Sequence, residues 1–83
     1  MTREPPHPGV VWRTLMEETG RTQADVSRAM GVSPKHLNQI LQGEALPSAG
    51  TTLAFAHAVG ASSRLMWQLV SDYKLADAER GES

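Results

Sequence analysis

The 83-residue sequence contains no cysteine, only four aromatic residues and no long apolar run. Without cysteine there is no disulfide, thiolate nucleophile or cysteine zinc site, so stability must come from helix packing or from a partner subunit. The apolar stretches are too short for a membrane span or the core of a signal peptide. We therefore expect a cytoplasmic protein, and a chain of this length supports a single domain.

The sequence also lacks an excess of charge of either sign. Its eight basic and nine acidic residues give a net charge of −1. This balance argues against a non-specific nucleic-acid coat protein. The charges are nevertheless uneven: within residues 21–38, Arg21, Arg28 and Lys35 are opposed only by Asp25, whereas residues 72–83 carry more acidic than basic groups. A mildly basic segment of this kind favours the approach of one face to phosphate.

The chemistry of an enzyme is absent as well. His7, His36 and His57 are spaced in a way that fits no metal-ligand pattern. The sequence contains no phosphate-binding loop, no convincing pair of carboxylates and no nucleophile with an evident base. We predict a protein that is not an enzyme and needs no cofactor or metal, in which His7 and His57 are structural or exposed.

Glycine, proline and small polar residues divide the chain into five predicted helices, and no strand pattern is present. Thr22 and Asp25 resemble a capping box, Gly31 permits a sharp turn, and Ser33 with Pro34 is typical of a helix start. The predicted helices cover residues 8–19, 23–30, 34–42, 49–59 and, after a cap at residue 62, a stretch that reaches at least residue 73. We expect residues 1–7 to be a flexible arm, residues 8–74 to form the domain, and residues 75–83 to be a polar tail that frays.

The second and third predicted helices form a helix-turn-helix. Val26 and Met30 on one helix are spaced to meet Leu37 and Ile40 on the next across a tight turn that Val32 plugs. This packing leaves the opposite face of the later helix free to enter a DNA major groove.

Residues 22–43, TQADVSRAMGVSPKHLNQILQG, resemble the Xre-like helix-turn-helix family, which includes phage repressors. The whole chain is similar to the HigA-type antitoxins within it, through HPG at 7–9, AFAHAVGASS at 54–63, and Trp67 with Tyr73 and Leu75. The resemblance implies an all-α, lambda-repressor-like DNA-binding domain. It also implies a protein that represses its own operon and neutralises a RelE-like ribonuclease toxin.

One position departs from the family pattern. Ser27 stands at a tight interhelical position where the family usually has alanine. Serine is nearly as small, so we expect its hydroxyl to bond back to a backbone carbonyl and leave the fold intact.

The polar residues of the helix-turn-helix supply a plausible DNA interface. Lys and Arg pair with guanine edges and Asn or Gln with adenine edges, whereas backbone contacts fix the register. For any one of these residues a solvated polar face is an equal alternative, but the set is harder to explain by solubility. The predicted base-reading residues are Ser33, Lys35, His36, Asn38 and Gln39, and the predicted DNA-backbone residues are Arg21, Gln23, Arg28 and Gln42.

A core this small cannot easily bury two tryptophan side chains. Trp12 and Trp67 could each lie half-buried at its rim. Alternatively, Trp67, Val70 and Tyr73 form a homodimer contact, which would place two reading helices on a palindromic double-stranded DNA operator. The sequence does not decide whether the first or the fifth helix makes this contact.

The functional hypothesis is a homodimeric transcriptional repressor that acts as an antitoxin. A phage or prophage regulator without a toxin is the first alternative. A protein-interaction module that has lost DNA binding is the second.

Overall fold

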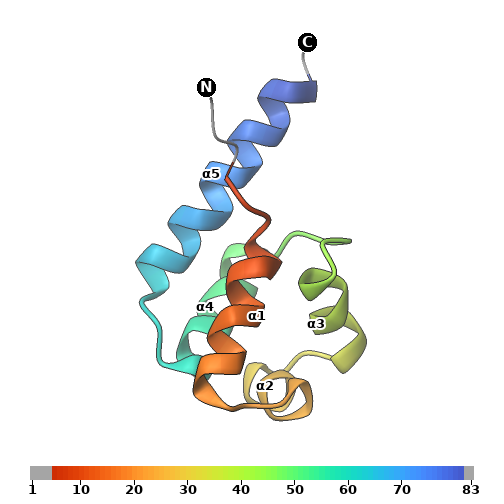
Figure 1. The fold of residues 1–83 in the computed structure, drawn as a ribbon, viewed down its shortest axis with the longest axis vertical. Coiled ribbons are helices and arrows are strands. Elements are labelled where there is room, and N and C mark those ends of the chain that lie inside the picture. The colour runs from red at the N-terminus through yellow and green to blue at the C-terminus, as the bar shows by residue number, and fades with distance from the viewer. Residues whose placement is uncertain (1–4, 82–83) are drawn as a thin grey trace.

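A computed structural model of the chain describes residues 5–81, which form five helices and contain no strand. In Figure 1, α1 to α4 gather at one end of the molecule, and α5 packs beside α4 and α1 and extends beyond them. The prediction of an all-α fold is confirmed. The helices are α1 (Pro8–Thr19), α2 (Gln23–Met30), α3 (Pro34–Leu41), α4 (Ala49–Val59) and α5 (Ser63–Gly81).

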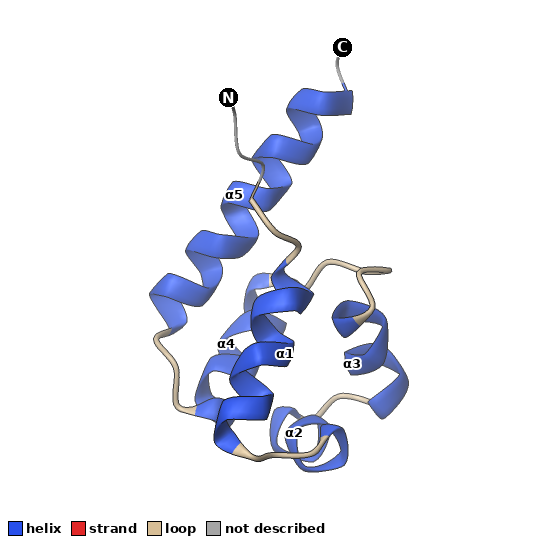
Figure 2. Cartoon of the chain, in the orientation of Figure 1, coloured by secondary structure: helices blue, strands red, loops and turns tan. Residues whose placement is uncertain are grey.

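The predicted helix boundaries are set by local capping. The Thr22 side chain accepts a hydrogen bond from the Asp25 amide, and the Asp25 carboxylate accepts one from the Thr22 amide, so the capping box is present. Ser33 and Ser48 cap α3 and α4 through their side chains, each of which accepts the backbone N–H of the third residue of its helix. These contacts satisfy amides that have no partner inside a helix. Figure 2 shows how short the connecting loops are.

The core is built around an aromatic pair. Trp12 of α1 stacks on Phe55 of α4, with ring centroids 4.0 Å apart and an interplanar angle of 2°. Trp12 is 1% exposed, so the prediction of a half-buried position at the rim is wrong for this residue. The reason is that α4 places the Phe55 ring directly against α1. Trp12 and Phe55 are 43 positions apart in the sequence, so no local sequence pattern predicts their contact. Trp67, in contrast, is half-buried as expected.

The carboxyl end of α3 is clamped by the first turns of α1. A Cβ on Gly9 would overlap the carbonyl oxygen of Ile40, so only glycine allows the two backbones to approach this closely. One turn further along, the Arg13 guanidinium donates to the carbonyl oxygen of Leu41 at 3.2 Å. The two contacts hold α3 to the body of the domain at the end opposite its capped start.

The last helix is longer than expected. Helix α5 continues to Gly81, whereas residues 75–83 were expected to be a frayed tail; residues 82–83 lie outside the described part. Pairs three or four residues apart support this helix: the Gln68 amide donates to the Asp72 carboxylate at 2.8 Å, and the Arg80 guanidinium donates to the Asp77 carboxylate at 3.0 Å. Such pairs stabilise an exposed helix.

At the other end, residues 5–7 form the loop before α1, and the rest of the predicted arm lies outside the described residues. Over residues 5–81, no helix is long and apolar enough to cross a membrane.

Candidate DNA interface

The turn between α2 and α3 has the geometry that the sequence predicts. Gly31 adopts a left-handed conformation with φ 74°, and its amide donates to the Arg28 carbonyl at 3.2 Å. The Val32 amide then donates to the Ser27 carbonyl at 3.1 Å. Because both bonds close onto the end of α2, the chain reverses within a few residues and α3 begins at once.

The position of Ser27 is also as predicted. Its side chain is buried, and its hydroxyl donates to the carbonyl oxygen of Ala24 at 3.2 Å. The departure from alanine therefore leaves no unsatisfied polar group in the contact between the helices.

Helix α3 separates into a buried and an exposed face. Leu37, Ile40 and Leu41 are buried against the rest of the domain, where α3 packs on α1 and α2. Lys35 and Asn38 are exposed, and His36 and Gln39 are half-buried beside them. The spacing of three residues between Lys35 and Asn38, and between His36 and Gln39, puts their side chains side by side on one surface of the helix. The structure thus brings four of the five predicted base-reading residues together.

The fifth predicted base-reading residue, Ser33, is the N-terminal cap of α3. Its hydroxyl oxygen accepts the His36 amide at 3.1 Å, which satisfies one of the free N–H groups of the helix. The residue is exposed, and its hydroxyl hydrogen can still donate to a neighbouring acceptor.

The predicted backbone-contacting residues lie before α2, on α2 and at the end of α3. Gln23 is the first residue of α2, Arg21 lies in the loop before it, and Gln42 follows the last residue of α3; all three are exposed. The Arg28 guanidinium is 3.8 Å from the Asp25 carboxylate, with 79% of the Arg28 side chain exposed. An ion pair so open to solvent contributes little, so it does not prevent Arg28 from reaching a phosphate.

The predicted dimer contact needs a correction. Val70 is fully buried within its own chain and has no surface to offer a partner. It lies on the side of α5 that packs on the domain. The apolar face of this helix is broad, and the sequence does not show which part of it is buried within the chain. Trp67 and Tyr73 are half-buried. Two exposed residues that the prediction omitted, Leu65 and Leu75, are 64% and 63% exposed on the same helix.

The histidines are not close enough together to suggest a metal. Among residues 5–81, no three histidine or acidic side chains are grouped so that they could hold a metal ion. His57 is exposed. The His7 side chain caps α1, as its Nδ1 accepts the Gly9 amide at 3.0 Å. Sequence reasoning missed this cap because histidine is not among the common capping residues.

The geometry of α2, the glycine turn and α3 defines a helix-turn-helix domain. The family model for this domain matches residues 9–69, which is most of the chain, and the protein belongs to the helix-turn-helix domain family. A comparison with curated protein sequences finds no match.

Solved structures of antitoxins are similar over nearly the whole chain. The antitoxin HigA of Pseudomonas aeruginosa, solved with the higBA promoter, is 28% identical with a TM-score of 0.84, over 94% of this chain and 86% of that one. A Pseudomonas aeruginosa protein in complex with its operator DNA is 28% identical with a TM-score of 0.83, over 94% and 87%. The antitoxin GraA is 27% identical with a TM-score of 0.83, over 96% and 87%. The resemblance to HigA-type antitoxins that the sequence indicates is therefore confirmed.

Proposed function

We propose that this protein is a transcriptional repressor that binds a palindromic operator as a homodimer. The observation that carries the proposal is the polar face of α3, where Lys35, His36, Asn38 and Gln39 project from a helix whose other side is locked into the core. A rigid helix with one free polar face fits a major groove, and these side-chain types match base edges. Similar structures solved with operator or promoter DNA support this assignment.

Within this face each residue has a distinct role. Lys35, in the first turn of α3, donates to guanine, and Asn38 and Gln39 pair with adenine edges. Arg21, Gln23, Arg28 and Gln42 contact phosphates on either side and set the register. Because the whole chain carries a net charge of −1, phosphate attraction alone is weak, and the paired sites of a homodimer compensate through effective concentration.

We further propose that α5 forms the homodimer contact. Leu75 exposes an apolar side chain on this helix about two turns after half-buried Trp67, so the two lie on adjoining faces of α5. Exposed apolar residues grouped on one element mark interaction surfaces. To read two half-sites one turn of DNA apart, this contact must hold the two α3 helices about 34 Å from each other.

A band-shift titration against the promoter fragment of the gene itself tests operator binding. We expect a sequence-preferring complex that Lys35→Ala and Gln39→Ala each weaken by about 1–3 kcal/mol, as for the loss of one base contact. The control is His57→Ala, which removes a polar side chain from an exposed position on α4, away from both α3 and the proposed dimer contact. Absence of a sequence-preferring complex at low salt would refute the proposal and favour a protein-interaction module.

Light scattering tests the homodimer. We expect a dimer at tens of micromolar, roughly the range in which weakly associating regulators pair, and a monomer for Trp67→Glu. Leu53→Glu is the control, because Leu53 is a 46% exposed leucine on α4. A monomeric wild-type protein at this concentration would contradict the proposed contact.

The antitoxin role is more specific than operator binding and needs its own test. We propose that the protein neutralises a RelE-like ribonuclease and represses the operon that encodes both. Co-expression with the product of the adjacent open reading frame tests this: rescue of growth is the expected result. An isolated gene with no growth-inhibiting neighbour would instead favour a phage or prophage regulator.

A further inference from the structure

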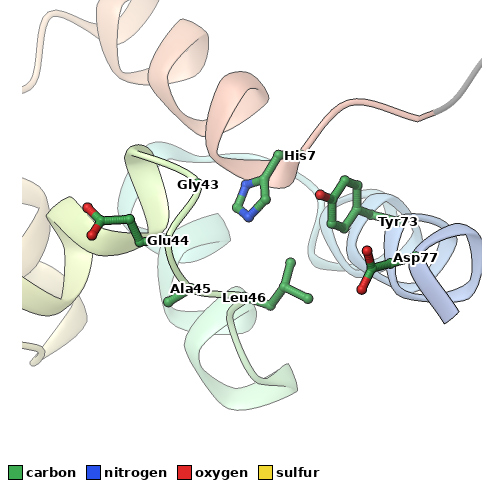
Figure 3. Close-up of a pocket in the computed structure, with 7 residues that line it drawn as sticks. All are labelled: His7, Gly43, Glu44, Ala45, Leu46, Tyr73 and Asp77. Atoms are coloured by element: carbon green, nitrogen blue, oxygen red, sulfur yellow. The ribbon is translucent and has the colours of Figure 1, made fainter. Parts of the chain in front are cut away.

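His7 lies where three parts of the domain meet. Its ring caps the start of α1, packs on the loop that follows α3, and faces α5 (Figure 3). In this loop the nearest ring atoms are 4.0 Å from the site of a Cβ on Gly43, which has a left-handed φ of 81°. On α5, the ring meets Tyr73 edge to face, with centroids 5.0 Å apart and an interplanar angle of 68°.

The Nδ1 atom of His7 is a hydrogen-bond acceptor only while the ring is neutral. Nδ1 accepts the Gly9 amide at 3.0 Å. The backbone of Ala45 also lies near the ring and favours its protonated form, which opposes the effect of burial on the pKa of His7. A neutral imidazole whose Nδ1 accepts a hydrogen bond carries its proton on Nε2.

The contacts of His7 lead directly to α3. The amide that His7 caps belongs to Gly9, whose Cα lies against the carbonyl of Ile40 near the end of α3. The other contacts of the ring, Gly43 and Ala45, lie just beyond that end. We propose that His7 is a positioning residue for α3: its neutral ring holds α1, α5 and the loop after α3 together, and protonation of the ring releases the carboxyl end of α3.

Protonation acts against this arrangement for two reasons. A proton on Nδ1 turns the acceptor of the Gly9 amide into a donor, so the cap of α1 is lost. The new positive charge also lies at the amino end of a helix, where the helix dipole disfavours cations. Burial lowers the pKa of His7 below its ordinary value of 6.5, although the backbone hydrogen bond at Ala45 acts in the opposite direction.

The other ionisable groups near the ring do not replace these contacts. Glu44 and Asp77 line the same hollow, whose volume is about 300 Å³, but the Glu44 side chain points away from the ring (Figure 3). The Asp77 carboxylate is 3.0 Å from the Arg80 guanidinium, which also lies 5.9 Å from the centre of the Tyr73 ring. Because the hollow is open, water can deliver a proton to His7 without unfolding of the domain.

Nuclear magnetic resonance of the free protein between pH 5 and 8 tests the proposal without DNA. We expect a neutral ring protonated at Nε2, a midpoint below 6.5, and amide signals of Gly9 and of residues 40–43 that move with the same midpoint. His57 is the internal control, because it lies on an exposed face of α4. A His7 ring that titrates at or above 6.5, or signals at residues 40–43 that do not follow it, would overturn the proposal.

A second experiment rests on the proposed function and measures operator binding at pH 8.0 and pH 5.5. His7→Asn keeps a capping acceptor but cannot be protonated. We expect the ratio of wild-type affinity to His7→Asn affinity to fall about threefold from pH 8.0 to 5.5, which requires that the pKa of His7 differ by at least about half a unit between the free and the DNA-bound protein. His36 is present in both proteins, so its own contribution to operator binding cancels in this ratio.

The control variant is His57→Asn, for which the ratio should not change with pH. An unchanged ratio for His7→Asn would overturn the coupling to α3. If no operator complex forms even at pH 8.0, the proposed function fails, and the resonance experiment alone decides the role of His7.

Discussion

At the scale of single residues, the fold depends on one close contact that only glycine allows. Gly9 lies on α1 with its Cα against the backbone of Ile40 and Leu41. Neither backbone can move without displacing a whole helix, so an added methyl group has no space to occupy.

We therefore expect Gly9→Ala to lower the free energy of unfolding by about 1–3 kcal/mol, the usual cost of overpacking. Gly50→Ala is the matched control: it lies on α4, a Cβ there meets nothing within 4 Å, and alanine is favoured over glycine in a helix by about 0.5–1 kcal/mol. Urea unfolding of both variants is the measurement. Equal effects of the two substitutions would contradict the close packing of α1 on α3.

At the scale of an element, the start of α2 depends on its capping box. The Thr22 and Asp25 side chains each accept the other's backbone amide. Both contacts lie within four residues, so the helix carries the information for its own start.

Thr22→Ala should cost about 1 kcal/mol of stability, the usual loss for a capping side chain. Thr14→Ala is its control, because the Thr14 hydroxyl only donates back to the Val10 carbonyl inside α1 and alanine is the better helix former. Thermal unfolding monitored by circular dichroism distinguishes the two. A Thr22→Ala protein as stable as the wild type would show that the capping box contributes nothing to α2.

At the scale of the whole molecule, the His7 contacts join α1, α5 and the loop after α3. Protonation of His7 therefore changes the free energy of unfolding of the whole domain. Since the pKa of His7 in the folded state lies below its ordinary value, the unfolded chain binds the proton first as the pH falls through about 6.5. The contribution of His7 is therefore complete above this pH and declines below it.

Chemical denaturation at pH 8.0 and at pH 5.5 measures this linkage. We expect the wild-type protein to lose more stability between the two pH values than His7→Asn does, whereas His57→Asn should lose as much as the wild type. Parallel losses for the wild type and His7→Asn would mean that His7 has the same proton affinity in the folded and unfolded states.

The sequence by itself determined the features that depend on neighbours along the chain. The starts of α2, α3 and α4, the turn at Gly31 and the division of α3 into a buried and a polar face could all be predicted, because caps, turns and helical periodicity act over a few residues. The membership in the helix-turn-helix family follows from the same short pattern.

Only the tertiary structure decided which residues meet across long separations. The stack of Trp12 on Phe55, the bond from Arg13 to Leu41 and the contact of His7 with Tyr73 join residues at least 28 positions apart. Burial of Val70 likewise depends on how α5 docks, which periodicity cannot specify. The physical reason is that these contacts arise when whole helices pack, and the packing is set by the combined shape of all five helices rather than by any one segment.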